Sequence, residues 1–235
     1  MYIAKGKEYN TIERHVNAPL FKRIFDCKTN EISTIKITAV GLYRLFLNGK
    51  ELNKSWFAPY LSNPDEIVFY DEYDVIGQLK PKNNVLCVLL GNGFVNNNDF
   101  NIWQNETATY RSAPKFDLQF KIGDETVFES DEEFLVADSP ITFDDFRCGE
   151  RYDANLEIEN VLESTSLENF GKPLIVAPPK GEIIKNSAQP VVAAGERSAV
   201  AIKKTETGYI YDFGVNDTGI PCLEISAQKG QKFEL

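Results

Sequence analysis

The residues of this chain whose chemistry best suits ligand binding lie in one segment, 91–103. It carries five asparagines, one aspartate and a tryptophan, Trp103. Amide and carboxylate oxygens are hard ligands of the kind that Ca²⁺ prefers, and an indole ring can stack on the face of a sugar. The competing interpretation is that the asparagines serve backbone geometry, because asparagine tolerates the left-handed conformation of turns. The sequence leaves both interpretations open.

Other reactive groups are scarce, which excludes several kinds of active site. A single histidine, His15, rules out zinc sites built on several histidines and leaves a serine nucleophile without a motif to activate it. Glycoside hydrolysis needs two carboxyl groups about 5–10 Å apart across a sugar. Adjacent acidic residues such as Asp144 and Asp145 point to opposite faces of a strand, so we interpret them as surface charge. The sequence therefore predicts no catalytic residue.

The segments that must position these residues have the alternating pattern of β-strands. Apolar and polar residues alternate strictly at 116–122, and the Asn48–Gly49 pair between apolar runs is a strong hairpin signal. Helical patterns are scarce. Further strands are predicted at 34–40, 42–47, 67–73, 85–90, 126–128, 134–137, 202–204, 209–213 and 222–227. Many short strands separated by turn residues predict an all-β protein, built as a sandwich or a barrel.

Six short motifs occur in an order that points to a known family. They are G-L-Y-R-L-F-L-N-G-K at 41–50, A-P-Y at 58–60, Y-D-E-Y-D-V at 70–75, L-L-G-N-G-F at 89–94, G-E-R-Y-D-A at 149–154 and Y-D-F-G-V-N-D-T-G at 211–219. In this order they resemble the N-terminal region of bacterial α-L-rhamnosidases of glycoside hydrolase family 78. Two positions depart from the family pattern, since Asn155 stands where arginine is usual and Phe94 where tryptophan is usual.

The resemblance implies a fold, a domain organisation and a function. The fold would be all-β, with jelly-roll-like β-sandwich modules of the galactose-binding kind, one at 1–155 and an incomplete second one at 156–235. In the family, hydrolysis takes place in a helical barrel of several hundred residues downstream of these modules, and a chain of 235 residues has no room for it. The implied function is a non-catalytic accessory region that supports the catalytic domain of its parent enzyme.

The resemblance also implies an alternative function, the binding of L-rhamnose or rhamnosides through Ca²⁺. The family's N-terminal sandwich is similar to carbohydrate-binding module family 67, whose members can bind L-rhamnose in this way. On this interpretation the metal ligands are Asn48, Asn97 and Asp99. The sugar contacts are Trp56, Asn97, Asp99, Trp103 and Glu150. The rival interpretation is a scaffold that binds neither the ion nor the sugar.

Composition and charge limit the classes of binding partner and indicate the cellular compartment. The net charge of −10, from 25 basic and 35 acidic residues, argues against nucleic acid and anionic membranes as partners. The first residues lack the apolar core of a signal peptide, and no run approaches the roughly 18 apolar residues of a membrane span. The four cysteines are far apart and form no C-x-x-C pair, so we interpret them as reduced thiols. These features predict a cytoplasmic protein.

Overall fold

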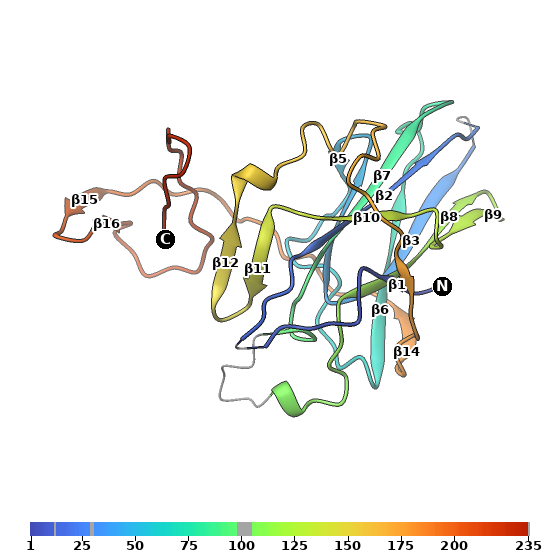
Figure 1. The fold of residues 1–235 in the computed structure, drawn as a ribbon, viewed down its shortest axis with the longest axis horizontal. Helices are drawn as coiled ribbons and strands as arrows, with labels where there is room; N and C mark the ends of the chain where they lie inside the picture. Colours follow the sequence, from blue (N-terminus) through green and yellow to red (C-terminus); the bar gives the residue numbers. More distant parts are fainter. Residues whose placement is uncertain (12, 29–30, 98–104, 235) are drawn as a thin grey trace. The chain divides into compact units, whose positions relative to one another are not determined.

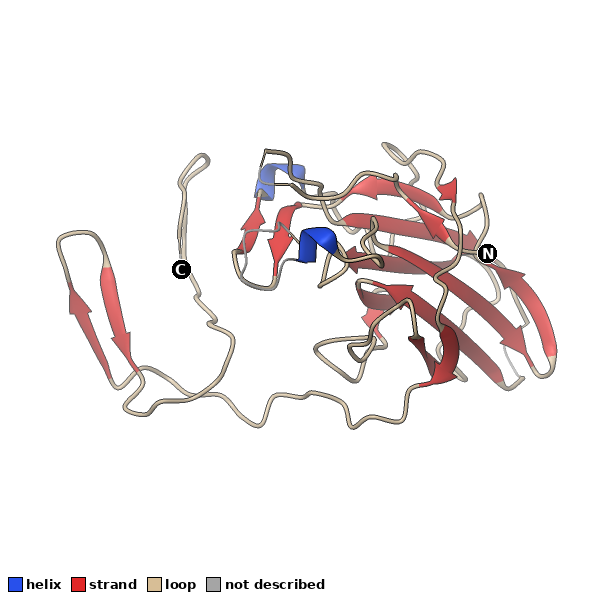
Figure 2. Cartoon of the chain, turned by 90° about the horizontal axis from the view of Figure 1, so that it is seen from below, coloured by secondary structure: helices blue, strands red, loops and turns tan. Residues whose placement is uncertain are grey.

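The computed structural model describes residues 1–11, 13–28, 31–97 and 105–234. Its regular structure is almost entirely β-strand, as predicted (Figures 1 and 2). The helical elements of the described residues are two short 3-10 turns, η1 (Asn105–Thr107) and η2 (Ala154–Leu156). No described helix is long and apolar enough to cross a membrane. The chain divides into two compact units, Met1–Val192 and Ala193–Leu235, which we call unit 1 and unit 2.

Unit 1 contains two large sheets and a separate hairpin (Figure 1). The first sheet has seven strands in the order β13-β1-β8-β3-β6-β14, with β9 paired to β8. These strands are β1 (Ile3–Ala4), β3 (Ser33–Val40), β6 (Ile67–Asp74), β8 (Lys115–Ile122), β9 (Glu125–Glu129), β13 (Leu174–Ile175) and β14 (Glu182–Lys185).

The second sheet of unit 1 has five strands in the order β10-β2-β7-β4-β5. These strands are β2 (Pro19–Phe25), β4 (Leu42–Leu47), β5 (Lys50–Glu51), β7 (Asn84–Gly91) and β10 (Leu135–Asp138). A two-stranded hairpin stands apart from both sheets and consists of β11 (Ile141–Asp145) and β12 (Gly149–Tyr152). Every pairing in unit 1 is antiparallel except that of β14 with β6.

The two sheets form a sandwich because the strands of each carry an apolar face. In the first sheet Ile35 lies opposite Phe120 and Ile37 opposite Leu118. In the second sheet, alternate residues of β4 are buried, whereas β7 is buried along most of its length. Side chains from both sheets belong to one core cluster. The predicted β-sandwich of unit 1 is therefore confirmed.

The predicted Asn48–Gly49 turn is also present, between β4 and β5. Both residues have positive φ, 53° for Asn48 and 86° for Gly49. A two-residue hairpin turn of type I′ needs this conformation at both central positions, which explains why Asn-Gly occurs here.

Residues 156–192 belong to unit 1. Val161, Leu162 and Phe170 cover the outer face of the second sheet, where they meet Leu20 and Cys87. Further along, β13 and β14 extend the first sheet at its two edges. The division between compact units thus follows Val192, whereas the sequence placed a module boundary after residue 155. The existence of a second sandwich module stays a prediction.

Unit 2 has little regular structure. Its hairpin pairs β15 (Ala201–Lys204) with β16 (Tyr209–Asp212). Beyond it, Asp212 Oδ1 accepts a hydrogen bond of 2.7 Å from the Gly214 amide, at a glycine with a φ of 74°. This turn lies within the 211–219 motif. The strand predicted at 222–227 does not form.

Candidate functional site

Three loops that carry or adjoin predicted site residues meet through a stack of aromatic rings. Phe94 follows β7, Phe146 lies between β11 and β12, and Phe57 lies in the loop after β5. The ring centroids are 4.4 Å apart for Phe94 and Phe146 and 6.1 Å apart for Phe57 and Phe146. We call these three rings the aromatic stack. Phe57 and Phe146 are 43% and 44% exposed, so the stack offers an apolar surface to solvent.

Beneath the stack, asparagines of the 91–103 segment form a buried network. Asn92 donates to the Asp144 carboxylate twice, from its amide at 2.7 Å and from Nδ2 at 2.5 Å. Asn96 Nδ2 donates to Asn92 Oδ1. Asn96 Oδ1 in turn accepts from the Asn10 amide at 2.7 Å. Asn92 and Asn96 therefore fit the interpretation that the asparagines serve the geometry of the loop, because their side chains hold the loop to β11 and to the N-terminal segment.

Asp144 is the carboxylate at the centre of this network, and burial raises its pKa to about 6. The two hydrogen bonds from Asn92 oppose that rise, while the nearby Glu150 and Asp145 add to it. Asp144 lies opposite Glu150 in the β11–β12 register. These two opposed carboxylates resemble the acid and base of a glycosidase. Both oxygens of Asp144, however, already accept hydrogen bonds from Asn92.

The predicted metal ligands do not come together. Asn48 lies beside the start of β7, where its Oδ1 accepts from the Val85 amide at 3.0 Å and its Nδ2 donates to Gln78 O and Asn84 Oδ1. Asn97 follows the end of the same strand and is buried. Eight residues of β-strand separate the two, which is roughly 20 Å or more.

Asn48 and Asn97 therefore lie too far apart in this structure to contact one ion, and the calcium set itself stays a prediction. Asp99 and Trp103 lie outside the described residues. Among the residues that the structure does describe, no group of three or more histidine, cysteine, aspartate or glutamate side chains is placed to hold a metal ion.

The predicted sugar contacts Trp56 and Glu150 are both exposed, and the aromatic stack joins the loop of Trp56 to the loop that precedes β12. Trp56 is 54% exposed, and its amide donates to Val191 O at 2.8 Å. It precedes Phe57 in the chain. Glu150 lies in β12, close in sequence to Phe146. Their placement is compatible with a shared surface, and their contact with a sugar stays a prediction.

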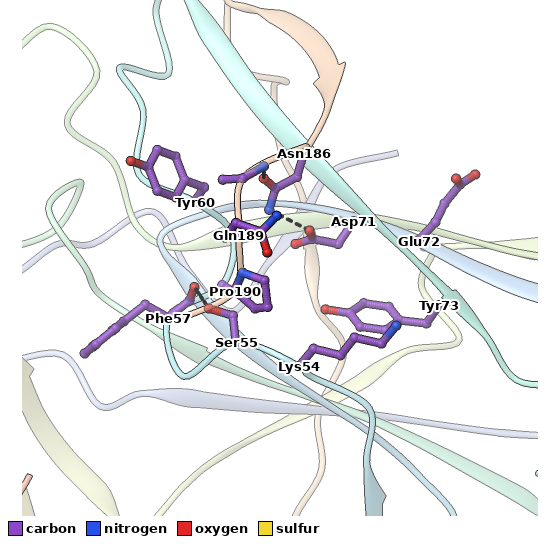
Figure 3. Close-up of a pocket in the computed structure, with 12 residues that line it drawn as sticks. Lys54, Ser55, Phe57, Tyr60, Asp71, Glu72, Tyr73, Asn186, Gln189 and Pro190 are labelled. Atoms are coloured by element: carbon purple, nitrogen blue, oxygen red, sulfur yellow. Dashed lines mark hydrogen bonds between the residues drawn. The ribbon is translucent and has the colours of Figure 1, made fainter. Parts of the chain in front are cut away.

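The sequence did not predict a cavity of about 140 Å³ between the 54–60 loop, β6 and residues 186–190 (Figure 3). Its floor joins the two sheets, because Tyr43 of β4 donates to Asp71 Oδ2 at 2.5 Å and lies 2.7 Å from the Tyr73 hydroxyl. Burial raises the pKa of Tyr43, and Tyr73 and Asp71 raise it further, so Tyr43 stays neutral and donates. Tyr60, Asp71 and Tyr73 all lie in the family motifs at 58–60 and 70–75, and these motifs were the signal in the sequence that could have pointed to the cavity.

The second oxygen of Asp71 faces the other wall of the cavity. It accepts a hydrogen bond of 2.8 Å from Asn186 Nδ2. Glu72 points away from the cavity in Figure 3 and forms an ion pair with Lys185. The described cavity thus contains one inward carboxylate, and both of its oxygens are occupied.

Comparison with known proteins identifies the family. The model of the alpha-L-rhamnosidase N-terminal domain matches residues 28–194. An alpha-L-rhamnosidase of Formosa agariphila is 31% identical over 215 residues, which is 86% of this chain and 22% of the relative. The chain therefore spans about a fifth of the length of that relative.

Solved structures agree on the fold. The alpha-L-rhamnosidase from Dictyoglumus thermophilum is 23% identical with a TM-score of 0.76, covering 91% of this chain and 25% of that one. The Streptomyces avermitilis alpha-L-rhamnosidase complexed with L-rhamnose is 22% identical with a TM-score of 0.75, covering 85% of this chain and 20% of that one. With well over half of its length matched by the family model, the chain belongs to the alpha-L-rhamnosidase N-terminal domain family.

Proposed function

We propose that this chain is the non-catalytic N-terminal region of an α-L-rhamnosidase-like glycoside hydrolase and that it supports the catalytic domain of that enzyme. The observation that carries this proposal is its membership of the N-terminal domain family together with its coverage of 22% of a curated α-L-rhamnosidase. The arrangement of carboxylates favours a non-catalytic role. Glycoside hydrolysis uses one carboxyl group as an acid and a second as a base or nucleophile, whereas Asp71 and Asp144 are both held by hydrogen bonds within the fold.

An activity assay tests the non-catalytic role. The purified chain should release no nitrophenol from nitrophenyl α-L-rhamnoside above the rate in buffer. Asp144→Asn and Glu150→Gln are the informative variants, because these residues form the opposed carboxylate pair. Release by the wild type that is lost in either variant would make the chain an enzyme in its own right and overturn the proposal.

The second candidate function is the binding of L-rhamnose at the aromatic stack. Its support is the exposure of Trp56, Phe57 and Phe146 and that of Glu150, four residues after Phe146 in the chain. Aromatic rings present large apolar faces, which suit the methyl edge of a deoxysugar. A neighbouring structure, from Streptomyces avermitilis, is of a complex with L-rhamnose. The calcium-dependent form of this binding, with Asn97 and Asp99 among the metal ligands, stays a prediction that the same measurement tests.

Calorimetry with L-rhamnose tests this second candidate. A dissociation constant between about 1 µM and 1 mM is expected, which corresponds to about 4–8 kcal/mol. Phe146→Ala should weaken binding, whereas Phe213→Ala, which removes an exposed ring of unit 2, should not. Heat that disappears when a chelator is added would support the calcium-dependent form, and heat that survives the chelator would overturn it. No heat under any condition would leave the scaffold function alone.

A further inference from the structure

The loop after β5 combines a hollow with a protruding side chain. Lys54, Ser55, Phe57 and Ala58 line the cavity of about 140 Å³ (Figure 3), whereas Trp56, in the middle of the same loop, is not among its described lining residues. Trp56 is instead 54% exposed. Its indole ring therefore lies outside its own cavity and beside the residues that form the cavity wall.

Hydrogen bonds fix the backbone on both sides of Trp56. The Trp56 amide donates to Val191 O at 2.8 Å. The preceding side chain, Ser55 Oγ, accepts from the Val191 amide at 3.1 Å and donates to Phe57 O at 2.8 Å. The protruding side chain thus starts from a fixed position relative to the cavity.

Further exposed apolar side chains adjoin Trp56. On one side, Phe57 contacts Phe146 of the aromatic stack. On the other, Tyr60 and Leu61 are 51% and 55% exposed and line a second, shallow hollow of about 30 Å³. Tyr60 lines both hollows, so these five side chains form one continuous surface, which we call the contact face. A large exposed apolar surface of this kind is typical of a protein interface.

The size of the contact face suits a weak interface. An aromatic side chain covers roughly 150–250 Å², so its four rings, at 43–54% exposure, leave about 300–500 Å² uncovered. Leu61 and the adjoining Val191 and Val192, at 47–59% exposure, enlarge this area. A standard interface buries about 800 Å² on each partner, and weak, transient ones bury less than about 600 Å². The contact face therefore fits a reversible complex.

Charge favours a second copy of the chain as the partner. The net charge of −10 makes two copies repel each other over most of their surface. Around the cavity, however, Lys54 and Lys185 balance Asp71 and Glu72. A face that carries both signs can meet an identical face without net repulsion, whereas it offers a strongly acidic or basic partner no complementary field.

We propose that the contact face binds a second copy of this chain, with Trp56 of each copy inserted into the cavity of the other. A two-fold contact requires that each copy carry both the protrusion and the hollow, and the loop after β5 carries the two side by side. The cavity is smaller than a pocket for a drug-sized ligand and has room for one side chain. Tryptophan is a frequent anchor at the centre of interfaces, where it fills a pocket of the partner. The dimer needs neither a catalytic domain nor a sugar, so it is independent of both proposed functions.

Sedimentation equilibrium of the full chain tests the proposal, at protein concentrations from about 1 µM to 1 mM. A monomer–dimer equilibrium with a dissociation constant of about 10–100 µM is expected. Trp56→Ala removes the protrusion and should weaken the dimer at least about tenfold. Gln189→Arg places a longer, charged side chain at an exposed position of the cavity wall and should weaken it as much.

A mixture of the two variants tests the reciprocal insertion itself. Each variant alone has lost both contacts of the dimer. A mixed pair keeps one of them, between Trp56 of the Gln189→Arg copy and the unaltered cavity of the Trp56→Ala copy. If the two contacts contribute equally, a tenfold loss should be recovered by about threefold in the mixed pair. General adhesiveness of an apolar surface would give no such recovery.

Ile76→Ala is the control, because Ile76 follows β6 and is 52% exposed, and it should leave the dissociation constant unchanged. Thermal unfolding of every variant checks that unit 1 is intact. A wild type that stays monomeric up to 1 mM would overturn the proposal.

Two further results would also overturn it. A dimer that Phe213→Ala abolishes and Trp56→Ala leaves intact would assign the contact to unit 2. A mixture that associates no more tightly than each variant alone would rule out the reciprocal insertion. None of these results bears on the non-catalytic function.

Discussion

Strands of the two units contain the same residue types, but their side chains differ in burial. In unit 1, Ile35 and Ile37 of β3 are fully buried at 0% exposure. In unit 2, Ile202 of β15 and Ile210 of β16 are 60% and 56% exposed. The difference lies in what faces each strand. The second sheet covers β3, whereas the described residues of unit 2 form a single hairpin with no facing layer.

This comparison separates two properties that an alternating pattern seems to predict together. Alternation specifies an extended strand with one apolar face, but burial of that face depends on a second layer. A two-stranded hairpin alone is at best marginally stable in water. Unit 1 should therefore carry essentially all of the folding free energy of this chain.

The largest expected effect is in hydrogen exchange. Central strands exchange only through global unfolding, which costs about 5–15 kcal/mol, whereas marginal hairpins open at almost no cost. Amides of β3 and β8 should exchange at least about a thousandfold more slowly than those of β15 and β16. Mass spectrometry of the intact chain, followed by digestion, measures both sets in one experiment.

The edge strand β14 provides the internal control, since it pairs only with β6 and should exchange at an intermediate rate. Protection of β15 and β16 equal to that of β3 would mean that unit 2 has a core in solution. In that case the contrast between the units would not hold.

A smaller effect is expected from truncating one side chain in each unit. Leu45 of β4 is fully buried between the sheets, so Leu45→Ala should lower the unfolding free energy by about 2–5 kcal/mol. Ile210→Ala removes an exposed side chain and should change it by less than about 0.5 kcal/mol. Urea denaturation followed by tryptophan fluorescence measures both values. Equal losses would contradict the assignment of stability to unit 1.

The sequence predicted the strands of unit 1 well because their signals are local. The range 42–47 matches β4 at both ends, and 116–122 matches β8 to within one residue. The Asn48–Gly49 turn also depends on adjacent residues only. By contrast, the strand predicted at 222–227 does not form, and no described strand lies beside it to pair with it.

The site was less predictable because its contacts join distant parts of the chain. Asn96 was a candidate ligand-type residue, yet its partners Asn10 and Asn92 make it structural. Asn48 and Asn97 were predicted to share an ion, but Asn48 lies beside the start of β7 and Asn97 follows the end of that strand. The contact of Asn186 with Asp71 spans 115 residues, and no local pattern marks it.

The smallest of the three effects compares a half-buried carboxylate of unit 1 with an exposed one of unit 2. Each accepts a hydrogen bond from a nearby backbone amide, Asp144 from Asn92 and Asp212 from Gly214. Burial raises the pKa of Asp144 from 3.8 to about 6, so the folded state favours its protonated form. The stabilisation from this proton is complete below about pH 4 and is lost as the pH rises through about 6.

The unfolding free energy of the wild type, relative to that of Asp144→Asn, should therefore fall by about 1–3 kcal/mol between pH 4 and pH 7. Asp212→Asn is the matched control, since it removes an exposed carboxylate and should change the unfolding free energy by less than about 0.5 kcal/mol. Urea titrations at several pH values measure both differences. If the difference in unfolding free energy between the wild type and Asp144→Asn does not change with pH, the Asp144 carboxylate is solvated in the folded chain. The hydrogen bonds from Asn92 would then not hold the loop after β7 over this carboxylate.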